Sequence, residues 1–142
     1  MYVLDASVAV KWFRADEPDL DAADAVLDAV RSNPKRFWVP EMFFVEMLSA
    51  LARVPLVPPA DLLRDLGTLQ DLGIQRVRHD RQVIAGAAAL VRSHGITSYD
   101  AIYCATAQLI GGAWLTADRR ALEKLPAGCD FALDLQAWHA RP

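Results

Sequence analysis

Cysteine and long hydrophobic runs are both scarce in this sequence. Its 142 residues include two cysteines, Cys104 and Cys129, which lack the density of a disulfide scaffold and the spacing of a metal site. The longest apolar stretches, such as residues 84–91, are too short to cross a bilayer, and Asp5 falls where a signal peptide would begin its apolar run. We therefore expect a reduced, cytoplasmic protein that is not associated with a membrane.

Positive charge is not in excess either. Fifteen Lys and Arg residues stand against 18 Asp and Glu residues, a formal net charge of −3, so the chain has no basic nucleic-acid footprint. If a metal neutralises the four carboxylates singled out below, 15 basic and 14 acidic residues remain. A surface with that charge balance can tolerate a bound polyanion. Net charge therefore neither supports nor excludes a nucleic-acid partner. The length predicts a single domain over residues 1–142.

Short apolar runs alternate with segments of helical periodicity along the chain. The runs predict strands at residues 2–4, 37–39, 74–78, 113–116 and 129–133. The periodic segments predict helices at residues 6–13, 19–31, 41–53, 61–72, 81–94, 98–110 and 119–125. Pro40 is expected at a helix start, where its missing N–H costs nothing. The alternation predicts an α/β sandwich built on a mostly parallel sheet.

Four carboxylates occupy notable positions in this scheme. Asp5 and Asp118 each follow a predicted strand, Asp100 opens a helix, and Glu46 lies in the helix after the second strand. Each has a local alternative. The three aspartates suit helix caps or a helix N-terminus, and Glu46 could lie on a solvent-exposed face. Because ligands bind at the carboxyl ends of parallel strands, we expect all four to meet at one sheet edge.

Clustered carboxylates repel one another, and a bound cation relieves that repulsion. An all-oxygen set without His or Cys favours Mg²⁺ or Mn²⁺ over Zn²⁺. Ser7 lies two residues after Asp5, where its hydroxyl can hydrogen-bond and orient the carboxylate. We expect Asp5 and Asp100 to bind the ion directly. Glu46 and Asp118 are expected to bind directly, through water, or at a second ion.

Four short segments occur in order along nearly the whole chain: Val3-Leu4-Asp5-Ala6-Ser7, Pro40-Glu41 followed by Glu46, Ser98-Tyr99-Asp100-Ala101-Ile102-Tyr103, and Leu115-Thr116-Ala117-Asp118. In order, spacing and chain length they resemble the PIN-domain family, and most closely the VapC-type toxins of bacterial toxin–antitoxin pairs. The resemblance implies a three-layer α/β/α sandwich with a central parallel sheet. It also implies an endoribonuclease that depends on Mg²⁺ or Mn²⁺.

The resemblance assigns the acidic set by motif position to Asp5, Glu46, Asp100 and Asp118, with Ser7 and Thr116 as polar helpers. It further implies a cognate antitoxin that inserts into the active-site groove, and often a homodimer. Hydrolysis of RNA would leave a 3′-hydroxyl and a 5′-phosphate. We expect loss of Asp5 to abolish cleavage and leave the fold intact.

Basic residues near the acidic set are candidates for holding RNA phosphates. Arg119 is the first choice because it follows Asp118 directly, and Lys11 and Arg14 lie on the first helix. For any one of them, a solvated surface position is the simpler explanation. Three other functions compete for the chain as a whole. They are a phosphotransferase with Asp5 as nucleophile, a catalytically silent binding scaffold, and a PIN-like nuclease of RNA processing that is not a toxin.

Overall fold

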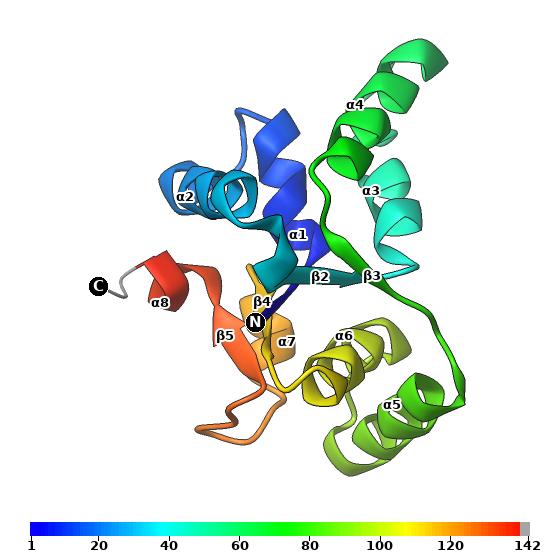
Figure 1. The fold of residues 1–142 in the computed structure, drawn as a ribbon, viewed down its shortest axis with the longest axis vertical. Coiled ribbons are helices and arrows are strands. Elements are labelled where there is room, and N and C mark those ends of the chain that lie inside the picture. Colours follow the sequence, from blue (N-terminus) through cyan, green and yellow to red (C-terminus); the bar gives the residue numbers. More distant parts are fainter. Residues whose placement is uncertain (140–142) are drawn as a thin grey trace.

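A five-stranded parallel sheet forms the centre of the computed structural model, which describes residues 1–139 (Figure 1). The strands lie in the order β3-β2-β1-β4-β5, and every neighbouring pair is parallel. Their bounds are β1 (Tyr2–Leu4), β2 (Phe37–Pro40), β3 (Gln75–Val77), β4 (Ala113–Thr116) and β5 (Ala132–Asp134). The sheet is therefore more uniform than the mostly parallel arrangement expected from the sequence.

Helices cover both faces of this sheet (Figure 1). On one side lie α1 (Ala6–Ala9), α2 (Leu20–Ser32), α3 (Phe43–Leu51), α4 (Pro59–Asp71) and α8 (Leu135–His139). On the other side lie α5 (Arg81–His94), α6 (Ser98–Leu109) and α7 (Arg119–Leu122). Two short 3-10 helices, η1 (Val10–Phe13) and η2 (Pro34–Arg36), complete the connections. The predicted α/β/α sandwich is confirmed.

The hydrophobic core is divided into two clusters by the sheet. Alternating strand residues point to opposite faces, so Val3 and Trp114 pack with α5 and α6, whereas Leu4 and Leu115 pack with α1 to α4. All four of these side chains are fully buried. Both clusters contain side chains of β1 and β4, so packing on both faces holds these two neighbouring strands in place. The residues that follow their carboxyl ends are therefore held in defined positions.

The largest difference from the expected elements lies around Pro40. This residue ends β2 opposite Val77, and the next N–H, that of Glu41, donates to the Val77 carbonyl. Strand pairing therefore continues through Pro40, and α3 begins only at Phe43. The expectation that Pro40 starts a helix was wrong, because a proline at a strand end loses little when the following residue donates the ladder hydrogen bond.

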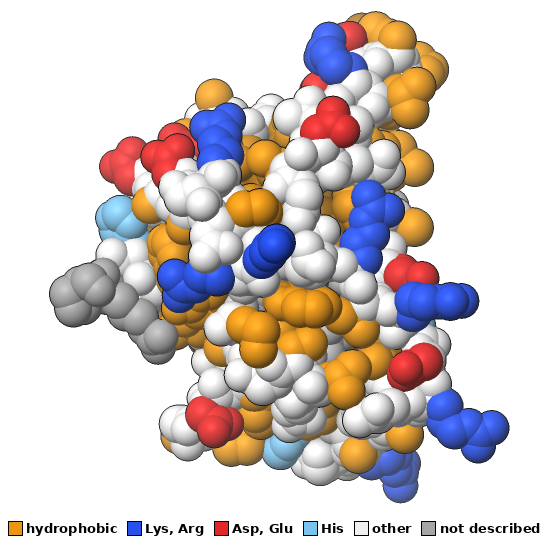
Figure 2. Space-filling view, viewed as in Figure 1, with side chains coloured by type: hydrophobic (Ala, Val, Ile, Leu, Met, Phe, Trp, Pro, Cys, Tyr) orange, Lys and Arg blue, Asp and Glu red, His pale blue; other side chains and the backbone are white. Residues whose placement is uncertain are grey.

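Exposed hydrophobic side chains gather where α3 and α4 extend away from the sheet (Figure 1 and Figure 2). Leu56 in the connection is 99% exposed and Leu63 on α4 is 73% exposed, with Val45 and Leu48 on α3 also exposed. No helix within residues 1–139 combines the length and the apolar character needed to cross a membrane.

Candidate metal centre

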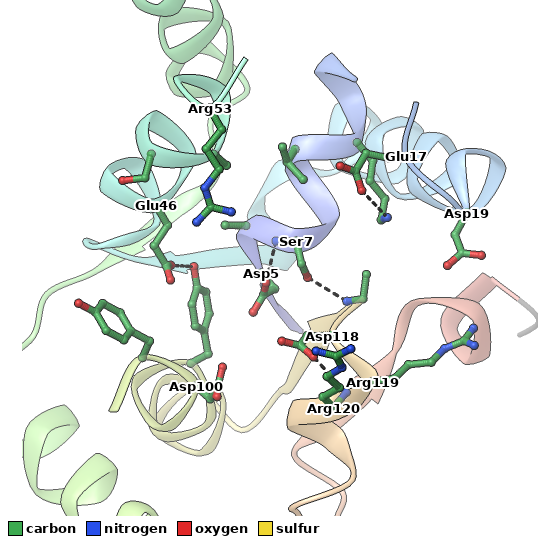
Figure 3. Close-up of a pocket in the computed structure, with 18 of the residues that line it drawn as sticks. Asp5, Ser7, Glu17, Asp19, Glu46, Arg53, Asp100, Asp118, Arg119 and Arg120 are labelled. Carbon is green, nitrogen blue, oxygen red and sulfur yellow. Dashed lines mark hydrogen bonds and ion pairs between the residues drawn. The ribbon is translucent and has the colours of Figure 1, made fainter. Parts of the chain in front are cut away.

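All four acidic side chains singled out by the sequence line one pocket at the carboxyl ends of β1 and β4 (Figure 3). Leu4 pairs with Leu115, so the residues that follow these two neighbouring strands emerge at the same edge. Asp5 and Asp118 come from that edge, Glu46 from α3 and Asp100 from the first turn of α6. The structure thus brings together four residues that are far apart in the chain. Their role as metal ligands stays a prediction.

Asp5 is the most buried of the four, with 8% of its surface exposed. It caps α1: its Oδ1 accepts the Ser7 backbone N–H at 2.7 Å. Its Oδ2 accepts the indole N–H of Trp114, also at 2.7 Å. Burial raises the pKa of Asp5 above its ordinary value, against the lowering effect of hydrogen bonds from Ser7 and Trp114, and the charge of Asp100 raises it further. Asp5 therefore caps α1 and lines the acidic pocket at the same time.

Glu46 is half-buried, and its side chain points into the pocket instead of toward bulk solvent (Figure 3). The Tyr103 hydroxyl donates to its Oε2 at 2.5 Å. Burial raises the pKa of Glu46 to about 7, and the charges of Asp5 and Asp100 contribute in the same direction, while the hydrogen bond from Tyr103 opposes the shift. Repulsion between these carboxylates indicates a site that a cation would stabilise.

Asp100 and Asp118 are held in local hydrogen bonds at the starts of helices, as the helix-capping alternative predicted. The Thr97 hydroxyl donates to Asp100 Oδ2 at 2.6 Å and accepts the Asp100 N–H at 3.1 Å. Asp118 caps α7, and its Oδ1 accepts the N–H groups of Arg120 and Ala121. In each aspartate a single carboxylate oxygen accepts the side-chain hydrogen bonds, Oδ2 in Asp100 and Oδ1 in Asp118. The second oxygen is left available to the pocket.

The hydroxyls of Ser7 and Thr116 link the start of α1 to the end of β4. They lie 3.3 Å apart, Ser7 Oγ accepts the Ala117 N–H, and Thr116 Oγ1 accepts the Asp118 N–H. Thr116 is fully buried. The Ser7 backbone N–H donates to Asp5 Oδ1, and the Ser7 side chain also lowers the pKa of Asp5 by hydrogen bonding, as expected from the sequence. The two hydroxyls fix the loop that carries Asp118.

The donor set fits a hard divalent cation. It consists of carboxylate oxygens around a partly buried pocket, flanked by hydroxyls, which is the chemistry that Mg²⁺ and Mn²⁺ prefer. Within residues 1–139, no three His, Cys, Asp or Glu side chains already form a group that could hold an ion. Asp100 and Asp118 are held in local hydrogen bonds, so binding of one ion by all four acids requires their side chains to move toward Asp5 and Glu46.

The PIN domain family model matches residues 2–127 of the chain. The chain belongs to the PIN domain family. Ribonuclease VapC3 of Pyrobaculum aerophilum is 48% identical over 52 residues, a match of 37% of this chain and 40% of that relative. The matched part is thus less than half the length of the relative, so the relative's activity is not carried over by identity alone.

Solved structures share the fold of this PIN domain at low sequence identity. PAE2754 from Pyrobaculum aerophilum has a TM-score of 0.70 and 23% identity, covering 99% of this chain and 93% of that one. A chain of a toxin-antitoxin complex from Klebsiella pneumoniae also has a TM-score of 0.70, with 16% identity and coverage of 95% and 98%. These likenesses establish the three-dimensional arrangement of the PIN domain.

The three cations expected to contact RNA each have a partner within the protein. Lys11 is buried, and its Nζ donates to the Pro18 carbonyl at 2.9 Å and lies 3.5 Å from Glu17. Arg14 forms an ion pair with Asp16 and a longer one with Glu17, and Arg119 lies 3.5 Å from Asp134. Lys11 therefore holds the loop before α2 together. The RNA contacts of these residues stay predictions.

Arg53, Arg120 and Tyr99 also line the pocket and were not singled out as sites. Figure 3 shows Arg53 on the α3 side of the carboxylates and Arg120 on the α7 side. Both are exposed, and neither forms an ion pair with another described residue. A signal for Arg53 existed: in the helix predicted over residues 41–53 it follows Glu46 by seven residues, about two turns, and would share its face. In the structure α3 ends at Leu51, just before it.

Replacing Glu46 by Gln is expected to stabilise the metal-free protein at alkaline pH. With a folded pKa of about 7 against an ordinary 4.5, Glu46 binds its proton more tightly in the folded state. Its ionisation therefore lowers stability as pH rises from about 4.5 to about 7. Gln keeps an acceptor for Tyr103 and removes the charge. Melting curves in EDTA at pH 5 and pH 8 test this, and equal shifts at both values would contradict it.

Proposed function

We propose that this PIN domain is a Mg²⁺- or Mn²⁺-dependent endoribonuclease that acts as the toxin of a toxin–antitoxin pair. The observation that carries the proposal is the meeting of four carboxylates around one pocket, two of them with pKa values raised by burial and mutual repulsion. A ribonuclease among the relatives and a toxin-antitoxin complex among the structural neighbours support the choice of substrate and biological role.

In this proposal Asp5 and Asp100 hold the ion directly, and Glu46 and Asp118 complete its surroundings directly or through water. When bound, the ion would lower the pKa of a water and stabilise negative charge on the phosphate under attack. Ser7 and Thr116 keep the Asp118 loop at a fixed distance from Asp5. Water would cut the phosphodiester bond to leave a 3′-hydroxyl and a 5′-phosphate.

In the absence of metal the pKa of Glu46 is about 7, so its carboxyl group can hold or release a proton near neutral pH before the ion binds. One of its oxygens, Oε2, already accepts the hydrogen bond from Tyr103. Phosphates on either side of the cut would lie against Arg53 and Arg120, whose guanidinium groups flank the acids (Figure 3). Tyr99 is 61% exposed at the pocket rim, where its ring can stack on an unpaired base.

Replacing both Arg53 and Arg120 by Gln is expected to weaken binding of single-stranded RNA by about tenfold or more at low salt and to reduce its salt dependence. Each arginine would neutralise phosphate charge beside the pocket, and within residues 1–139 neither has an ion pair to lose. Fluorescence anisotropy with a labelled RNA in EDTA measures binding apart from cleavage. The matched control is Arg92→Gln on α5, an exposed arginine that does not line the pocket. An equal loss of RNA affinity in the double variant and in Arg92→Gln would contradict a specific RNA path past Arg53 and Arg120.

The proposed protein partners are a cognate antitoxin and a second copy of the chain. The exposed hydrophobic side chains of α3 and α4 support a protein partner, because such clusters mark interaction surfaces on soluble domains. Competition between the antitoxin and RNA for the pocket would be expected if the antitoxin inserts between the arginines. Size-exclusion chromatography of the chain alone and with the product of a neighbouring gene tests both partners.

Cleavage of a defined single-stranded RNA tests the function. We expect 5′-phosphorylated products in Mg²⁺ or Mn²⁺ and none in EDTA, and growth arrest on expression that co-expression of the antitoxin relieves. Cleavage without growth arrest would favour the RNA-processing alternative. Mn²⁺ calorimetry that finds no binding to a folded protein would favour the scaffold. Hydrolysis of a generic phosphomonoester in place of RNA would favour a phosphotransferase.

A further inference from the structure

Two aromatic rings lie stacked beneath the acidic pocket. Tyr103 on α6 and Trp114 on β4 are 2% and 0% exposed, their ring centroids are 6.1 Å apart, and their planes differ by 20°. Each carries one polar hydrogen, and the two hydrogens go to different acids of the pocket. The Tyr103 hydroxyl donates to Glu46 Oε2, and the Trp114 indole donates to Asp5 Oδ2.

These hydrogen bonds are not a consequence of burial alone. Trp38 on β2, a tryptophan packed against the same core cluster, has a buried indole nitrogen with no hydrogen-bond partner among the described residues. A buried indole nitrogen beside this core cluster therefore need not have an acceptor among the described residues. Trp114 instead meets the carboxylate of a residue 109 positions away, and Tyr103 meets one 57 positions away. The stack joins two acids from different parts of the fold, Asp5 at the N-cap of α1 and Glu46 within α3.

We propose that Tyr103 and Trp114 are positioning residues that hold Glu46 and Asp5 in the orientation needed to bind the divalent ion. The inference rests on the proposed metal-dependent function. Each ring fixes one oxygen of its carboxylate from below, so rotation of the carboxylate is restricted. Glu46 Oε1 and the remaining lone pairs of Asp5 are left facing the pocket. Because the two rings lie nearly parallel in an offset stack within the buried core, both acids share one support.

A fixed carboxylate binds an ion more tightly than a mobile one, because less conformational freedom is lost on binding. Groups that hydrogen-bond to metal ligands typically contribute about 10- to 100-fold to metal affinity or activity. We therefore expect the loss of either donor to weaken Mn²⁺ binding by about tenfold or more, although neither donor would touch the ion.

The first measurement is Mn²⁺ affinity by calorimetry, well below the melting temperature, for Tyr103→Phe and Trp114→Phe. Both substitutions keep an aromatic ring in the stack and remove the polar hydrogen. Trp38→Phe is the matched control, since it changes a tryptophan in the same core whose N–H has no described acceptor. We expect a dissociation constant about tenfold or more higher for Tyr103→Phe and Trp114→Phe, and unchanged for Trp38→Phe.

The second measurement uses the indole N–H resonances of the ¹⁵N-labelled protein, which report on the contact without cleavage. Addition of Mg²⁺ should shift the Trp114 resonance and leave that of Trp38 in place. If wild-type protein binds Mn²⁺ and both Phe variants bind it equally well, the positioning role is wrong and the metal-dependent function stands. If wild-type protein binds no Mn²⁺, the proposed function and this inference fall together.

Discussion

Asp100→Asn and Asp118→Asn are each expected to reduce RNA cleavage by about 1,000-fold or more while leaving the fold unchanged. Either change removes one negative charge from the candidate ion site, and a metal's charge stabilisation is worth several kcal/mol, where about 4 kcal/mol corresponds to that factor. The local structure survives because one carboxylate oxygen accepts the hydrogen bonds in each case, from the Thr97 hydroxyl in Asp100 and from the α7 amides in Asp118. An Asn side chain retains such an oxygen.

Asp80→Asn is the matched control for this experiment. Asp80 caps α5 with one oxygen that accepts the N–H groups of Gln82 and Val83, the same arrangement that Asp118 has on α7, but it does not line the acidic pocket. Initial rates on a labelled RNA in Mg²⁺ and melting temperatures in EDTA should be measured for all three variants. Equal activity of Asp118→Asn and Asp80→Asn would mean that Asp118 is only a cap.

Asp5→Asn is expected to be less stable than Glu46→Gln by about 1–3 kcal/mol in EDTA at pH 8. Both changes remove one negative charge from the pocket, so the relief of repulsion raises the stability of both variants. Asp5 differs because its two oxygens accept from two donors, Ser7 N–H and the Trp114 indole. The amide group of Asn would turn a donor toward one of them. Glu46 has one described donor, from Tyr103, which Gln still accepts.

Urea unfolding of the two variants at pH 8 measures this difference, and wild-type protein and Asp118→Asn serve as references. If Asp5→Asn and Glu46→Gln have equal free energies of unfolding, the two hydrogen bonds to Asp5 do not constrain it. This result bears on the choice of inactive variant. The sequence alone suggested that Asp5 could be changed without effect on the fold, and its contact with Trp114 argues for Asp100→Asn as the cleaner test.

The positions of the acids along the chain were predictable because they follow local rules. Asp5 and Asp118 come after apolar runs that became β1 and β4, and these strands are neighbours with Leu4 opposite Leu115. Parallel topology then places both at one edge. Thr97 and Asp100 formed the hydrogen-bonded helix start that their spacing indicated. Each of these features depends on residues close in sequence or on strand order.

The contacts that support the acids had no local signal. Trp114 read as an ordinary core residue, and its bond to Asp5 spans 109 positions. Glu46 could have faced solvent, because its helix left only a narrow polar sector. Its contact with Tyr103 joins α3 on one face of the sheet to α6 on the other, and so depends on how the whole domain packs. Lys11 looked like a surface cation, yet its charge is buried against the loop before α2. Such pairings are set by tertiary packing.

The most direct test of the account is a crystal structure of the wild-type protein grown with Mn²⁺, with the ion located by its anomalous scattering. We expect a strong peak in the pocket, with carboxylate oxygens of Asp5 and Asp100 at about 2.0–2.3 Å and Glu46 and Asp118 bound directly or through water. We also expect Trp114 to keep its hydrogen bond to Asp5. A well-ordered pocket with no peak, or a peak held by residues outside this set, would contradict the central claim.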